Sequence, residues 1–83
     1  MKLSPMYVEL YYVDDASPAE FIRFVREWMN DFDPPLSQRR LAREIGVQPQ
    51  HMSKWMQGKV APKPASRKRI LGGLRSIQLR EEL

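Results

Sequence analysis

The side chains with the clearest chemical potential lie close together, between residues 50 and 54. Gln50 and Lys54 are four residues apart, so a helix would place them one turn apart on the same face. A glutamine amide can form two hydrogen bonds with adenine, and a lysine can donate to the acceptor atoms of guanine. His51 and Ser53 would be exposed beside them. We interpret Gln50, His51, Ser53 and Lys54 as candidate base-reading residues; the alternative is a set of ordinary exposed polar side chains.

Polar and cationic side chains flank this segment on both sides in the sequence. Such side chains can bind the phosphates of a nucleic acid and so fix its position, although some of them must simply be solvated. The densest basic run, Arg67, Lys68 and Arg69, could equally be a solvated helix end. The candidate phosphate-contacting residues are Gln38, Arg39, Arg40, Arg43, Gln57, Lys59 and Lys63.

The sequence offers no constellation of residues for catalysis or metal binding. The chain has no cysteine, which excludes thiolate ligands, disulfides and thiol nucleophiles, and its single histidine, His51, has no second ligand nearby. The acidic residues are scattered in the first half, without a paired histidine or a glycine-rich phosphate loop. We therefore predict that the protein is not an enzyme and uses no metal, cofactor or small-molecule ligand.

Charge is divided unequally along the 83-residue chain, whose net charge is +4. Residues 1–35 contain three Lys or Arg and seven Asp or Glu, whereas residues 36–83 contain eleven and three. This asymmetry favours nucleic acid bound on one side of a single domain, with a solvated basic surface as the alternative. No apolar run is long enough for a membrane span and no signal peptide is evident, so we expect a cytoplasmic protein without membrane contact.

Local signals predict four helices that would position these side chains. Ser17 is a good N-cap, and Glu20 three residues later completes a capping box for a helix that runs to about Asp31. The glycines at 72 and 73 either divide the last helix or allow another helix to approach it closely. Trp28 and Trp55 lie on apolar helical stripes, which favours core positions over stacking platforms for single-stranded nucleic acid. The other helices are expected between Ser37 and Gly46, between Pro49 and Gly58, and from Pro64 or Ser66 onward.

Two of the predicted helices, joined by a turn, have a specific layout. A glycine at the turn allows a backbone angle that bulkier residues avoid, and the small Ala42 allows the second helix to pack over the first. The residues in register are Ser37 and Gln38 at the first helix start, Leu41 and Ala42 within it, Gly46 and Val47 at the turn, Met52 and Ser53 in the second helix, and Gly58 at its end. Pro62 and an apolar helix containing Ile70 and Leu74 follow. This pattern resembles the Cro and lambda-repressor-type helix-turn-helix family.

The resemblance implies a mainly α fold, a lambda-repressor-like domain of four to five helices over residues 17–83, with the motif at residues 37–58. It also implies a transcriptional regulator, such as a Cro-like repressor, in which a dimer binds a short palindromic operator in double-stranded DNA. Gln38 resembles the family residue that contacts a phosphate and braces the recognition helix. Two alternatives stay open: a DNA-binding antitoxin that also binds a protein partner, and a module of the same fold that binds protein without DNA.

The N-terminal segment, residues 1–16, is interpreted as an arm containing a β-strand at residues 6–13. A lone strand leaves backbone groups unpaired, so pairing with the same segment of a second chain would form a two-stranded ribbon. A flexible arm or an extra helical turn is an alternative, and the C-terminal helix could also form the dimer through Ile77, Leu79 and Leu83. The ribbon interface would comprise Tyr7, Val8, Leu10, Tyr11, Tyr12 and Val13.

Overall fold

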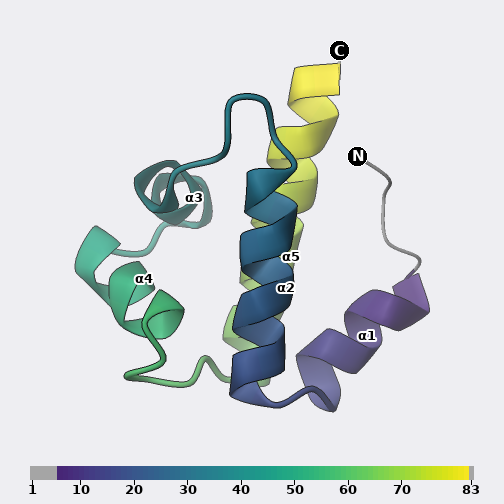
Figure 1. Cartoon of the computed structure of the whole chain (residues 1–83), viewed down its shortest axis with the longest axis vertical. Coiled ribbons are helices and arrows are strands. Elements are labelled where there is room, and N and C mark those ends of the chain that lie inside the picture. Colours follow the sequence, from purple (N-terminus) through teal and green to yellow (C-terminus); the bar gives the residue numbers. More distant parts are fainter. Residues whose placement is uncertain (1–5, 83) are drawn as a thin grey trace.

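The chain is mainly helical, as the sequence predicts. The computed structural model describes residues 6–82, apart from the side chains of residues 6–8 and 82. Within that range α5 is central and packs against α1, α2 and α3, while α3 packs against α4 (Figure 1). The five helices are α1 (Met6–Asp14), α2 (Pro18–Asn30), α3 (Gln38–Ile45), α4 (Pro49–Met56) and α5 (Pro64–Glu82).

The ends of α2 and α3 follow from their capping residues. Ser17 and Glu20 form the predicted capping box: each backbone N–H donates to the other side chain at 3.1 Å. These bonds from Ser17, and then the Tyr11 hydroxyl, lower the pKa of the Glu20 carboxyl. The Ser37 hydroxyl accepts from the Arg40 N–H, which caps α3. Gly46 ends α3 with a φ of 74°, a left-handed conformation that favours glycine.

The predicted N-terminal strand is wrong, because residues 6–14 form α1 and no strand occurs within residues 6–82. The aromatic and β-branched composition favours a strand, but tertiary packing overrides such propensity. Three side chains pack against the rest of the molecule: Tyr12 and Val13 from α1, and Ala16 just after it. The Tyr12 ring stacks on the Phe24 ring, with 3.9 Å between their centroids. Glu9, one turn before Val13, pairs with Arg75 of α5.

A buried arginine fixes the end of α1 against α5. Arg67 is 8% exposed, and its Nη1 atom donates to the carbonyl oxygens of Tyr12 and Ala16 at 2.8 Å each, with a longer contact to Val13. Its guanidinium also lies over the Phe21 ring, 5.1 Å from the centroid. A cation at the C-terminal end of a helix satisfies carbonyls that lack intrahelical donors. Arg67 is therefore a structural residue and not part of a solvated basic run.

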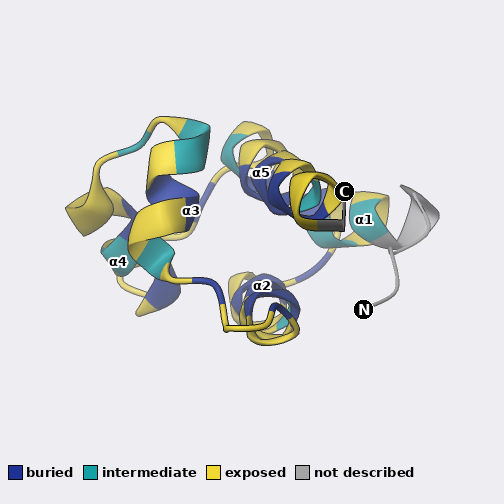
Figure 2. Ribbon diagram, turned by 90° about the horizontal axis from the view of Figure 1, so that it is seen from above, coloured by how far each residue is buried: buried dark blue, intermediate teal, exposed yellow. Residues whose placement is uncertain are grey.

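The core lies between α2, α5 and the α3–α4 pair, on the inner sides of the helices (Figure 2). Trp28 and Trp55 are each 4% exposed, which confirms their predicted core positions. The Trp28 indole N–H donates to the Gln78 side chain at 3.1 Å, so this buried polar pair joins α2 to α5. Leu41, Ala42 and Met52 are fully buried, as expected for two helices packed across a short turn.

The glycine pair in α5 does not divide the helix. A Cβ atom added at Gly73 would lie 2.4 Å from Ile45 Cγ2 and 3.3 Å from Leu41 Cδ1. Gly73 therefore allows α3 to approach α5 closely, one of the two roles predicted for the pair. Gly72, in contrast, is exposed, and a Cβ atom there would have no neighbour within 4 Å.

The two glycines should respond oppositely to substitution by alanine. Gly73→Ala should lower the free energy of unfolding by about 1–3 kcal/mol, because a γ-methyl group in a packed helix must move. Gly72→Ala should raise it by up to about 1 kcal/mol, because alanine is the better helix former. Urea denaturation of both variants measures the difference. A Gly73→Ala variant as stable as Gly72→Ala would contradict the close approach of α3.

The helix at residues 6–14 also removes the argument for a ribbon dimer. Its backbone groups bond within the helix, so they no longer need a second chain. Tyr12 and Val13 pack in the core of their own chain, while Leu10 and Tyr11 are exposed; the side chains of Tyr7 and Val8 lie outside the described residues. Of the three residues in the alternative dimer interface of the C-terminal helix, Ile77 is fully buried, Leu79 is exposed and Leu83 lies outside the described range.

Candidate nucleic-acid interface

The α3–α4 pair presents one face of α4 to solvent. The turn between the helices is held by the Val47 N–H, which donates to the Ala42 carbonyl at 3.0 Å. Met52, Trp55 and Met56 are buried on the inner side of α4. Gln50, His51 and Lys54 are exposed on the outer side. The helix therefore presents hydrogen-bonding groups outward while its apolar side anchors it.

The three exposed side chains share one hollow on the surface. It has a volume of about 280 Å³ and is lined by Gln48, Gln50, His51, Lys54 and Val60. The Gln50 side chain donates to that of Gln48 at 2.9 Å, and the His51 ring contacts the Trp55 ring, with centroids 4.5 Å apart. These contacts restrict Gln50 and His51 before any ligand binds, which reduces the entropy lost on binding.

Ser53 and Gln57 differ from the other candidates. Ser53 is half-buried, and its hydroxyl accepts a hydrogen bond from the Gln57 side chain at 3.0 Å. Gln57 is exposed one turn later, at the C-cap of α4. Ser53 is therefore placed to position Gln57 rather than to extend into the hollow beside Gln50.

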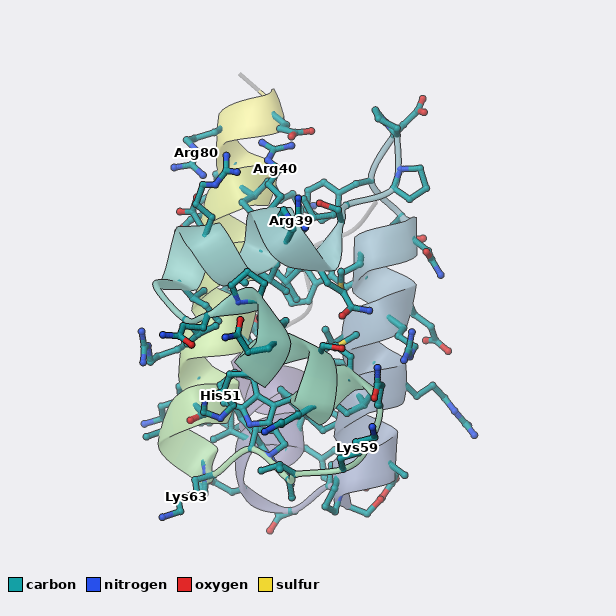
Figure 3. The ribbon with its side chains drawn as sticks, turned by 90° about the vertical axis from the view of Figure 1, so that its left-hand side faces the viewer. Arg39, Arg40, His51, Lys59, Lys63 and Arg80 are labelled. Carbon is teal, nitrogen blue, oxygen red and sulfur yellow. The ribbon has the colours of Figure 1, made fainter. Side chains whose placement is uncertain are left out.

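Cationic side chains lie on both sides of α4 (Figure 3). Arg39 and Arg40 project from α3 on one side, and Lys59 and Lys63 lie on the segment between α4 and α5 on the other. His51 lies between these two groups. These four cations belong to two separate stretches of the sequence, and the structure places them around the exposed face of α4.

Many of the basic residues in the second half already have protein partners. Besides the buried Arg67, Arg75 pairs with Glu9, and Arg69 donates to the Ile45 carbonyl at the end of α3. Within the described residues, the cations without a hydrogen-bond or ion-pair partner in this half are Arg39, Arg43, Lys54, Lys59, Lys63 and Lys68. Five of these six belong to the α3–α4 pair and the segment after it.

Two arginines that the sequence analysis did not select also belong to this region. Arg80, near the end of α5, projects beside Arg40 (Figure 3), and Glu44 of α3 pairs with it and raises its pKa. Arg26 of α2 donates to the Met56 carbonyl at 2.6 Å and so holds the C-terminal end of α4. Neither residue lies in the motif, and no local spacing indicates that α2 or α5 reaches it.

Gln38 lies at the first turn of α3, where its side chain is half-buried. With Arg26, it lines a second hollow of about 230 Å³ between α2 and the α3–α4 pair. The first turn of α3 also carries backbone N–H groups without intrahelical partners, of which that of Arg40 is capped by Ser37. This position is compatible with the predicted phosphate contact of Gln38.

The described residues contain no group of three or more metal-ligating side chains. Within residues 6–82, every helix is too short or too polar to cross a bilayer. No known protein family, curated protein or solved structure matches this chain.

Proposed function

We propose that this protein binds double-stranded DNA in a sequence-specific way and regulates transcription, as a Cro-like repressor does. In this proposal the α3–α4 pair is a lambda-repressor-type helix-turn-helix and α4 is its recognition helix. Gln50 and Lys54 read base edges in the major groove, with His51 beside them. Arg39, Arg43, Lys59 and Lys63 bind the phosphates on either side of the groove.

The arrangement of side chains around α4 is the observation that best supports the proposal. Its outer side exposes Gln50, His51 and Lys54, while cations without a partner among the described residues lie both before and after it. No Asp or Glu occurs between Glu44 and Glu81, so this outer side of α4 carries no acidic residue of its own. A narrow polar ridge between two sets of phosphate-binding groups suits a major groove, where base edges lie between two phosphate backbones.

We further propose that two copies bind neighbouring half-sites. One helix of this kind reads only a few base pairs, and half-sites on one face of DNA lie about 34–36 Å apart. The molecule measures 34 × 29 × 18 Å, so two copies at that spacing would adjoin each other. Helix α1 lies on the side opposite α4 (Figures 1 and 2), so it is poorly placed to join copies on the same duplex.

Selection of binding sites from a random pool of DNA duplexes tests the proposed function. We expect enrichment of a short motif repeated with two-fold symmetry, at a spacing of about one helical turn. A DNA-binding antitoxin would give the same enrichment and would also bind a protein partner. A pool without enrichment would contradict sequence-specific binding and favour the protein-interaction module.

Phosphate contact predicts a specific effect on salt dependence. Lys59→Ala and Arg39→Ala should each weaken binding to all duplexes alike and reduce the salt slope by about one unit, because one fewer phosphate is neutralised. Fluorescence anisotropy of a labelled duplex over a series of salt concentrations measures this slope. If neither substitution changes it, these side chains face solvent in the complex.

A further inference from the structure

The acidic residues of the basic half have an unusual position. Of the three, Glu44 and Glu81 have described side chains, and both pair with arginines. Glu81 of α5 pairs with Arg40 of α3 at 2.5 Å, and Glu44 of α3 pairs with Arg80 of α5. In one pair α3 supplies the arginine and α5 the glutamate, and in the other pair these roles are reversed. Figure 3 shows Arg40 and Arg80 near each other at one end of the molecule, beyond α3 from α4.

The arginine members of these pairs are accessible to a second anion. The Arg40 and Arg80 side chains are 50% and 58% exposed, whereas those of Glu81 and Glu44 are 34% and 24% exposed. Each carboxylate is therefore more covered by protein than its arginine. A phosphate that approaches from solvent can reach either guanidinium, which has five N–H donors and binds phosphate in a forked geometry.

We propose that Glu44 and Glu81 are internal competitors of DNA phosphates, and that duplex binding exchanges these carboxylates for phosphates on Arg80 and Arg40. This inference rests on the proposed DNA-binding function and adds a new phosphate-contacting residue, Arg80, outside the motif. Exposed ion pairs are weak and are weakened further by salt, so a DNA phosphate can compete with the carboxylate for the arginine. The carboxylates then limit the affinity that the protein has for DNA of any sequence.

The inference predicts tighter binding when either competitor is neutralised. Glu81→Gln and Glu44→Gln should each lower the Kd for a duplex of about 20 base pairs of arbitrary sequence by about three- to fivefold at about 50 mM salt. Asp14→Asn is the matched control, since it removes one negative charge from the end of α1, on the side opposite α4. It should change the Kd by less than about 1.5-fold.

A double-mutant cycle separates exchange from a general charge effect. When Arg40 is already replaced by alanine, Glu81→Gln should lose most of its effect, because the arginine paired with Glu81 is absent and only its weaker Coulombic effect on Arg80 remains. In the same way, Glu44→Gln should lose its effect in a protein that already contains Arg80→Ala. Thermal denaturation of each variant verifies that it is folded.

The failures of the two proposals are distinguishable. A wild-type protein that does not bind duplex DNA would overturn the proposed function and the exchange together. If the wild type binds but Glu81→Gln and Glu44→Gln match Asp14→Asn, only the exchange is overturned. The exchange is also overturned if Glu81→Gln and Glu44→Gln keep their full effects in proteins that already contain Arg40→Ala and Arg80→Ala, respectively.

Discussion

Replacement of Arg67 by methionine should lower the free energy of unfolding by about 3 kcal/mol, because at least two short, charge-assisted hydrogen bonds are lost. Methionine retains much of the aliphatic volume, so the loss reports on the guanidinium rather than on packing. Exchange of a buried ion pair for apolar residues is often neutral, since both charges leave together. Here the acceptors are the main-chain carbonyls of Tyr12 and Ala16, which remain in place without donors.

Lys68→Met is the matched control for this prediction. Lys68 is adjacent in α5, is exposed and has no partner among the described residues, so its replacement should change stability by less than about 0.5 kcal/mol. Urea denaturation of both variants gives the comparison. Equal stability of the Arg67 and Lys68 variants would show that Arg67 does not hold α1 in place.

The second large effect concerns base reading. On a site selected from a random pool, Gln50→Ala and Lys54→Ala should each weaken binding by about 1–3 kcal/mol, and should weaken binding to arbitrary duplexes less. Both side chains are exposed on α4, and neither contributes to the core, so stability should hardly change. Anisotropy titrations with the selected and an arbitrary duplex measure the two affinities.

Lys68→Ala separates a lost contact from a lost charge. Lys68 lines the hollow between α1 and α5, away from α4, and its removal changes the net charge as much as Lys54→Ala does. We expect it to leave the preference for the selected site intact. If Gln50→Ala and Lys54→Ala also leave that preference intact, α4 does not lie in the groove as proposed.

Helix ends were predictable where the signal is a local one. Ser17 and Ser37 cap α2 and α3 through bonds to residues three positions away, and Gly46 ends α3 through its own backbone angle. Such contacts need no knowledge of the rest of the fold. The same is true of the apolar stripes that contain Trp28 and Trp55.

Residues 6–14 were not predictable in this way. Their aromatic and β-branched side chains favour a strand, and only the contacts with Phe24, Arg67 and Arg75 explain why a helix forms. The basic run at 67–69 shows the same limit. Arg67 is buried, Lys68 is exposed, and Arg69 binds the end of α3, although all three have the same charge.

The candidate site was predictable where it lies within the motif. The residues on α3, α4 and the following segment come together around one exposed helix face, as their spacing suggests. Arg80 and Arg26 could not be selected, because they reach this region from α5 and α2. Contacts between residues thirty or more positions apart leave no periodic signal in the chain.

The affinity of the wild-type protein for duplex DNA, measured across salt concentrations, tests the central claim most directly. The four cations proposed to bind phosphates, Arg39, Arg43, Lys59 and Lys63, predict that the logarithm of the binding constant falls with the logarithm of salt concentration at a slope of about −4, to which the exchange at Arg40 and Arg80 adds up to about two units. Absence of duplex binding at about 50 mM salt, or a slope near zero, would contradict the account.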